Sequence, residues 1–233
     1  MAANSRYLQA AGQAVPPVVA AVALLLMWPT AAAGDDWHPA GENRGVALES
    51  RPTADGYRAY RGAVTVCTDL AGLQRFVADA SRLDEWIPFT EAARALPNED
   101  GQQLYYLRTS APWPFKSRDM VYRLTSESAV DDGTIHIRLE GLPDALPEQQ
   151  GVVRMKSAEG RWALTPGNGH IHVELRLAAN ARRAPAFFAD RRLAATVAGT
   201  LANLAEEFPC AGLGGEGSRS GSDPESRSGD RSH

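Results

Sequence analysis

Apolar and polar residues alternate along most of the chain between residues 35 and 210, a pattern typical of half-buried β-strands. In one such segment Ile171, Val173 and Leu175 share a face, while histidine and glutamate occupy the other. The predicted strands span residues 45–51, 57–67, 103–110, 117–126, 134–140, 151–157, 161–165 and 170–178, with a tight turn at Glu159-Gly160 between two of them. An antiparallel sheet with one apolar face needs a cover for that face.

A long amphipathic helix, predicted over residues 185–208, can supply this cover. Pro185 suits a first helical turn, and Pro209 cannot continue the helix. Its apolar stripe consists of Leu193, Val197, Leu201, Leu204 and Phe208. Two shorter helices are predicted over residues 69–80, with Asp69 as N-cap, and 81–85. A run of strands with helices at its ends indicates an α+β layer structure.

The two ends of the chain differ from this central domain, which we place at residues 34–210. Residues 1–33 have the features of a signal peptide: Arg6, an apolar run over 18–28, and a small-residue cleavage pattern at 31–33. The run is shorter than the roughly 20 residues that span a bilayer, so we expect a periplasmic or secreted protein. The alternative is anchorage by an uncleaved N-terminal segment. The Gly/Ser-rich, charged residues 211–233 are predicted to be a disordered tail.

The charge of the chain and the placement of its histidines argue against nucleic-acid binding and against a metal site. The formal net charge is −4 and the basic residues are scattered, so no nucleic-acid partner is expected. His170 and His172 lie two apart on the polar face of a strand without a completing Cys or paired carboxylate, so no metal or other cofactor is predicted. Export makes a disulfide between Cys67 and Cys210 plausible, and two unpaired thiols are the alternative.

An ordered set of short motifs resembles the START (StAR-related lipid-transfer) domains. The set comprises Trp37, Tyr60-Arg61-Gly62, Asp79, Trp86, Pro88, Pro112-Trp113-Pro114, Arg118-Asp119, Val153-Arg154, Trp162 through Pro166 and the final helix. The resemblance covers about residues 37–208. It implies a helix-grip fold, in which a curved antiparallel sheet wraps around a long C-terminal helix. It also implies binding or transfer of one lipid, such as a sterol or phospholipid, without catalysis. The sequence at 180–188 departs from the family, which often has a Gly-Gly turn and a Trp-Leu pair there.

Apolar positions on the inward faces are the candidate ligand contacts, because lipid pockets are lined mainly by apolar side chains with a few polar anchors. The predicted cavity residues are Trp86, Tyr106, Met120, Tyr122, Ile137, Leu175, Phe188, Val197 and Leu201. Each of them also fits a solid core. Arg118 and Asp119 either contact the ligand or pin a turn.

Three functions remain open at this stage. The first is a lipid carrier or sensor that touches membrane surfaces transiently. The second is an enzyme of the related cyclase/dehydratase group, for which Tyr106, Arg108, Tyr122 and Glu140 are the acid or base candidates. The third is an interaction module with a collapsed core and an active tail. The motif set favours the first function.

Overall fold

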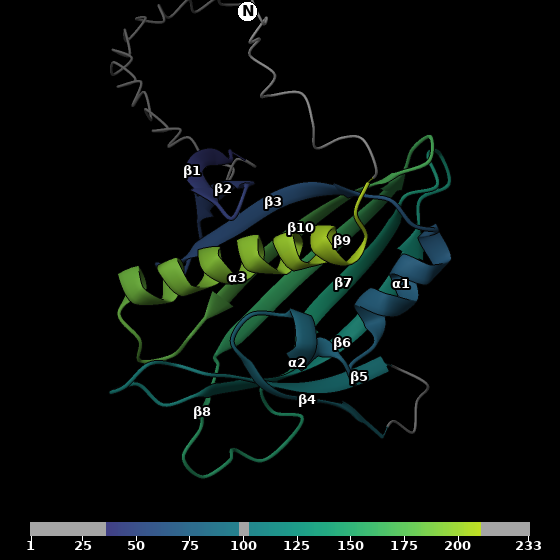
Figure 1. Ribbon diagram of the computed structural model, residues 1–233. Helices are drawn as coiled ribbons and strands as arrows, with labels where there is room; N and C mark the ends of the chain where they lie inside the picture. The colour runs from purple at the N-terminus through teal and green to yellow at the C-terminus, as the bar shows by residue number, and fades with distance from the viewer. Residues whose placement is uncertain (1–35, 98–102, 211–233) are drawn as a thin grey trace, which may run out of the picture. The chain divides into compact units, whose positions relative to one another are not determined.

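The computed structural model describes residues 36–97 and 103–210, which form one large sheet and three helices (Figure 1). The strands are β1 (His38–Asn43), β2 (Val46–Pro52), β3 (Arg58–Val66), β4 (Thr90–Leu96), β5 (Gln103–Thr109), β6 (Arg118–Ser128), β7 (Ile135–Gly141), β8 (Val153–Arg154), β9 (Ser157–Pro166) and β10 (Ile171–Asn180). Their order is β1-β2-β3-β10-β9-β7-β6-β5-β4 with antiparallel neighbours, and β8 pairs in parallel with β6. The predicted signal peptide and tail lie outside the described residues.

The helix α3 (Ala186–Glu207) lies on the concave face of this sheet and contacts β2, β3 and β10. Its buried stripe includes Val197, Leu201 and Leu204, as the helical spacing predicts. Leu201 occupies space that Gly62 of β3 leaves open, because a Cβ at Gly62 would lie 3.1 Å from the Leu201 Cδ1 atom. Sheet and terminal helix together form the predicted helix grip.

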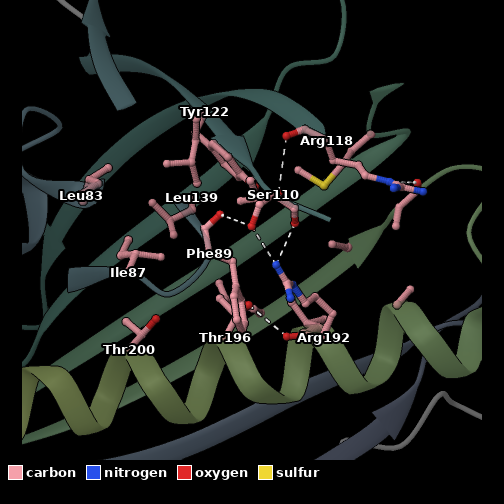
Figure 2. Close-up of a pocket in the computed structure, with 18 of the residues that line it drawn as sticks. Leu83, Ile87, Phe89, Ser110, Arg118, Tyr122, Leu139, Arg192, Thr196 and Thr200 are labelled. Carbon is pink, nitrogen blue, oxygen red and sulfur yellow. Dashed lines mark hydrogen bonds between the residues drawn. The ribbon is translucent and has the colours of Figure 1, made fainter. Parts of the chain in front are cut away.

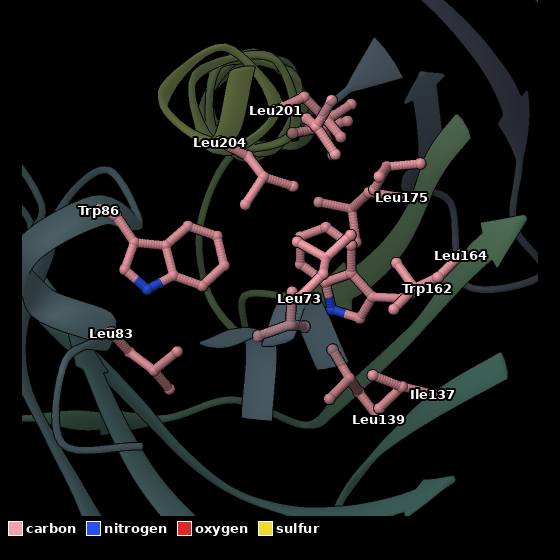
Figure 3. Close-up of a cluster of buried hydrophobic side chains, with 14 of the residues drawn as sticks. Leu73, Leu83, Trp86, Ile137, Leu139, Trp162, Leu164, Leu175, Leu201 and Leu204 are labelled. Atoms are coloured by element: carbon pink, nitrogen blue, oxygen red, sulfur yellow. The ribbon is translucent and has the colours of Figure 1, made fainter. Parts of the chain in front are cut away.

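The core confirms the face assignments made from the alternation. Ile135, Ile137 and Leu139 of β7 are buried, and so are Ile171, Val173 and Leu175 of β10, with β9 lying between the two strands. Figure 3 shows Leu201 and Leu204 of α3 pointing towards Trp86, Trp162 and the sheet leucines. Burying one such apolar side chain contributes about 1.5–3 kcal/mol, so this shared face holds the helix on the sheet.

The structure differs from the sequence prediction near β9 and at the edges of the sheet. Glu159-Gly160 is not a turn, because β9 continues through it, and β8 contains only two residues. Gly160 pairs with Leu139 and Leu177, and a Cβ there would lie 2.8 Å from a methyl group of each. The glycine therefore makes room for two leucines. The strands β1 and β4 were missed, since β1 is exposed throughout and β4 has no clear alternation.

The two short helices lie close to their predicted positions. The helix α1 (Leu70–Ala78) is capped by Asp69, whose carboxylate accepts a hydrogen bond from the Gly72 N–H at 2.7 Å. The helix α2 (Leu83–Trp86) begins two residues later than predicted. No helix in the described ranges is long and apolar enough to cross a membrane.

A disulfide joins Cys67, directly after β3, to Cys210 beyond the end of α3. A backbone hydrogen bond from the Cys67 N–H to the Phe208 carbonyl, 3.1 Å long, lies beside it. The two links tie the C-terminal end of the gripping helix to the sheet. Of the two alternatives that the sequence left open, the structure therefore contains the disulfide.

Candidate functional site

An apolar cavity of about 160 Å³ lies between the N-terminal half of α3 and the sheet (Figure 2). Leu107, Leu139 and Leu175 contribute its sheet wall, while Phe188 and Leu193 of α3 form part of its cover. Ile87 and Phe89 line it from the segment that follows α2. This apolar lining suits a hydrophobic ligand, because transfer of apolar surface out of water is favourable.

Two stacked tyrosines provide neutral polar groups in this wall. The rings of Tyr105 and Tyr122 lie 5.4 Å apart between centroids, at 25°. Burial raises the pKa of both phenols, so both stay protonated at neutral pH. Thr200 of α3 adds a buried hydroxyl that has no hydrogen-bond partner among the described residues. These hydroxyl groups can donate to a polar atom of a ligand.

An arginine that sequence reasoning missed lies at the edge of the cavity. Arg192 of α3 donates from Nη2 to the carbonyl and the hydroxyl oxygen of Ser110, each at 2.9 Å (Figure 2). Its guanidinium carbon lies 3.4 Å from the ring centroid of Phe89. Phe89 has a φ of +69°, a left-handed conformation that is uncommon for a bulky residue. Desolvation lowers the pKa of Arg192.

The missed side chains on α3 share a spacing that could have revealed them. Arg192, Thr196 and Thr200 recur every four residues, so a polar line runs beside the apolar stripe. All three residues line the cavity.

Arg118 and Asp119 do not act as a pair. Arg118 lines the cavity and donates to the carbonyls of Lys116 and Ala181. Asp119 is fully buried away from it, where Nε of Arg154 lies 2.9 Å from its carboxylate. Successive residues of a strand point to opposite faces, so the ligand-contact hypothesis is wrong for Asp119. Arg154 also donates to the carbonyls of Pro143, Leu146 and Pro147.

The other predicted cavity residues fall into two groups. Tyr122, Leu175 and Phe188 line the cavity. The solid core contains four others: Trp86, Ile137, Val197 and Leu201. Met120 packs against Met155 and Ala158, and the guanidinium group of Arg94 lies over the ring of Tyr106. Alternation identifies the inward face, but not the part of that face where the helix leaves space, so these six assignments to the cavity need correction.

The acid and base candidates for an enzyme are also dispersed. Arg108 forms an ion pair with Glu91 at 2.9 Å, and Glu140 forms one with Arg123 at 3.2 Å. Of the four candidates named from the sequence, Tyr122 alone lines the cavity.

An antiparallel sheet that wraps around α3, with an apolar cavity beneath the helix, defines the class of helix-grip domains. No protein-family model matches the chain. A STAR-related lipid transfer protein from Xanthomonas axonopodis is 32% identical in sequence and superposes with a TM-score of 0.66, over 74% of this chain and 98% of that one. The chain therefore belongs to the START (StAR-related lipid transfer) domain family.

One further protein is similar in sequence and another in fold. The uncharacterized protein PA1579 of Pseudomonas aeruginosa is 31% identical over 144 residues, which are 61% of this chain and 71% of that protein. The human StarD13 lipid transfer and protein localization domain shares the fold, with a TM-score of 0.63, 15% identity, and coverage of 75% of this chain and 90% of that domain.

Proposed function

We propose that the protein binds a single lipid in the cavity beneath α3 and carries it between membrane surfaces without chemical change. The observation that supports this most directly is the apolar cavity itself, with leucine walls and a few hydroxyl groups. The likeness to the Xanthomonas lipid transfer protein, at 32% identity over nearly all of that chain, points the same way. Binding without catalysis also agrees with the dispersed acid and base candidates.

Filling the cavity tests this proposal. Thr196→Trp places an indole in the space between α3 and the sheet, and we expect the lipid retained per chain to fall at least about tenfold. Overpacking costs about 1–3 kcal/mol of stability, so the variant should remain folded by circular dichroism. The measurements are mass spectrometry of extracted lipid and titration with an NBD-labelled fatty acid.

Arg191→Trp is the matched control, because Arg191 is exposed on the same helix and does not line the cavity. This variant should bind lipid as the wild-type protein does. Wild-type protein that repeatedly purifies without lipid and shows no saturable binding of the fatty acid would contradict the proposal.

Two exposed aromatic residues lie on segments that adjoin the cavity, and we propose that they contact the membrane. Trp113 is 92% exposed in the loop between β5 and β6, and Phe187 is 77% exposed in the first turn of α3. Stacking of Phe115 on Phe188, with 4.7 Å between ring centroids, joins these segments, and Phe188 also lines the cavity. Aromatic side chains are favoured at bilayer interfaces.

The Trp113→Ser/Phe187→Ser double variant should bind anionic phospholipid vesicles about tenfold more weakly, because two large aromatic side chains no longer enter the interface. Vesicle sedimentation measures this binding. Val130→Ser is the control, since Val130 is 98% exposed on the hairpin between β6 and β7. Equal loss in both variants would count against the proposed contact.

We further propose that the protein acts outside the cytoplasm, as residues 1–33 suggest. The disulfide supports this location, because such bonds persist mainly in oxidising compartments. Cell fractionation followed by sequencing of the mature N-terminus tests both export and cleavage. Recovery of the full-length chain from the cytoplasm alone would count against them.

A further inference from the structure

The charged side chains that line the cavity are all of one sign. Among the described residues on its wall, Arg118 and Arg192 carry charge, and none is an aspartate or glutamate. Other arginines of the described ranges, such as Arg108 and Arg154, form ion pairs with carboxylates, but no such pair among the described residues involves Arg118 or Arg192. Within the part of the chain that the structure describes, these two cations therefore have no anionic partner.

The surroundings of Arg192 leave part of its hydrogen-bonding capacity unused. Its Nη2 atom donates to Ser110, but its Nε atom is buried and has no hydrogen-bond partner in residues 36–97 and 103–210. The Phe89 ring against the guanidinium contributes a cation–π contact and no net negative charge. Arg118 likewise donates to carbonyl oxygens, and no carboxylate of the described segments pairs with its charge.

Such an arrangement is costly in the absence of a ligand. An unpaired charge that leaves water loses hydration energy, and arginine cannot escape this cost by releasing its proton at ordinary pH. Desolvation lowers the pKa of both residues, which agrees with their placement against apolar surface. An anion in the cavity offsets the cost, and the planar guanidinium group matches the geometry of a carboxylate or phosphate.

We propose that the ligand is a single-chain amphiphile with an acidic head group, and that Arg192, assisted by Arg118, binds this group. The inference rests on the proposed lipid-binding function and names the ligand class for the same cavity. The apolar chain lies against Leu107, Leu139 and Leu175 of the sheet. The cavity volume of about 160 Å³ lies below the roughly 300–1,000 Å³ of most ligand pockets, which favours one acyl chain over two.

Matched ligand pairs test the charge requirement. Delipidated full-length protein is titrated by calorimetry with oleate and methyl oleate, and with lysophosphatidic acid and lysophosphatidylcholine. We expect each acidic ligand to bind at least about tenfold more tightly than its partner, because only the acid supplies the missing counter-charge. The stronger of the two acids identifies a carboxylate or a phosphate as the preferred head group.

Substitution of Arg192 assigns the preference to this side chain. Arg192→Met keeps much of the apolar stem and removes the charge, so oleate should bind at least about tenfold more weakly, while methyl oleate changes less than threefold. Arg118→Met should reduce oleate affinity by a smaller factor. Arg191→Met, on the exposed side of the same helix, should change neither ligand.

The outcomes separate this inference from the underlying function. Equal affinity for oleate and methyl oleate, or equal losses for both in Arg192→Met, overturns the role of the arginine and leaves lipid binding intact. If the wild-type protein binds none of the four ligands, and the fatty-acid titration above also fails, the proposed function itself is overturned.

Discussion

Replacing Asp119 with alanine is expected to lower the free energy of unfolding by about 3–5 kcal/mol, because it leaves the buried charge of Arg154 without its carboxylate. The two side chains are 0% and 2% exposed, and two nitrogen atoms of Arg154 donate to the two carboxylate oxygens at 2.9 and 3.1 Å. The same guanidinium group also donates to carbonyls of the segment before β8. Urea unfolding followed by circular dichroism measures the change.

A second ion pair on β6 provides the control. Arg123 and Glu140 are 3.2 Å apart, but their side chains are 35% and 43% exposed. Exposed pairs contribute about 0–1 kcal/mol, so Glu140→Ala should be nearly neutral. A double variant, Asp119→Leu/Arg154→Met, should recover part of the stability that Asp119→Ala loses, because it removes both charges. Equal losses in the free energy of unfolding for Asp119→Ala and Glu140→Ala would show that the buried pair stabilises the fold no more than the exposed pair.

Loss of the disulfide is the second large effect that we expect. The bond joins residues 143 positions apart, so it removes much of the conformational freedom of the unfolded chain. In the chain-entropy description, a loop of this length corresponds to about 5 kcal/mol at 25 °C, near the upper end of the measured range. Cys67→Ala/Cys210→Ala should therefore unfold at a markedly lower urea concentration than the oxidised protein, with α3 less firmly held on the sheet.

Reduction distinguishes the cross-link from the packing of the cysteines. Dithiothreitol should destabilise the wild-type protein by a similar amount and should leave the double variant unchanged. Titration of the folded, air-oxidised protein with a thiol reagent should detect no free thiol. Two reactive thiols, or a stability that is insensitive to reduction, would contradict this expectation.

Local pattern was sufficient for much of the fold. The period of the α3 stripe, the proline on each side of it and the cap at Asp69 depend on residues close in sequence, so they could be recognised without coordinates. Alternation likewise assigned Ile137 and Leu175 to the inner face. The role of Gly160 could not be read from the sequence, because a glycine can mark a turn or make room for neighbouring side chains. Gly160 makes room for two leucines.

The candidate site was predicted less well, because it depends on contacts between distant segments. Val197 and Leu193 belong to the same helical stripe, yet Val197 is buried in the solid core and Leu193 lines the cavity. The choice depends on where other strands leave space, and no spacing along α3 contains that information. Asp119 and Arg154 are 35 residues apart, and their pairing follows from the docking of β8 on β6.

The sequence by itself determined the class of fold, the inner face of the strands, the gripping helix and the family resemblance, because periodicity and ordered motifs are properties of the linear chain. Only the tertiary structure decided which part of the apolar face stays open and that Arg192 reaches it. It also decided that Cys67 pairs with Cys210. These features depend on how segments far apart in the chain pack together, and close packing of side chains is a three-dimensional property.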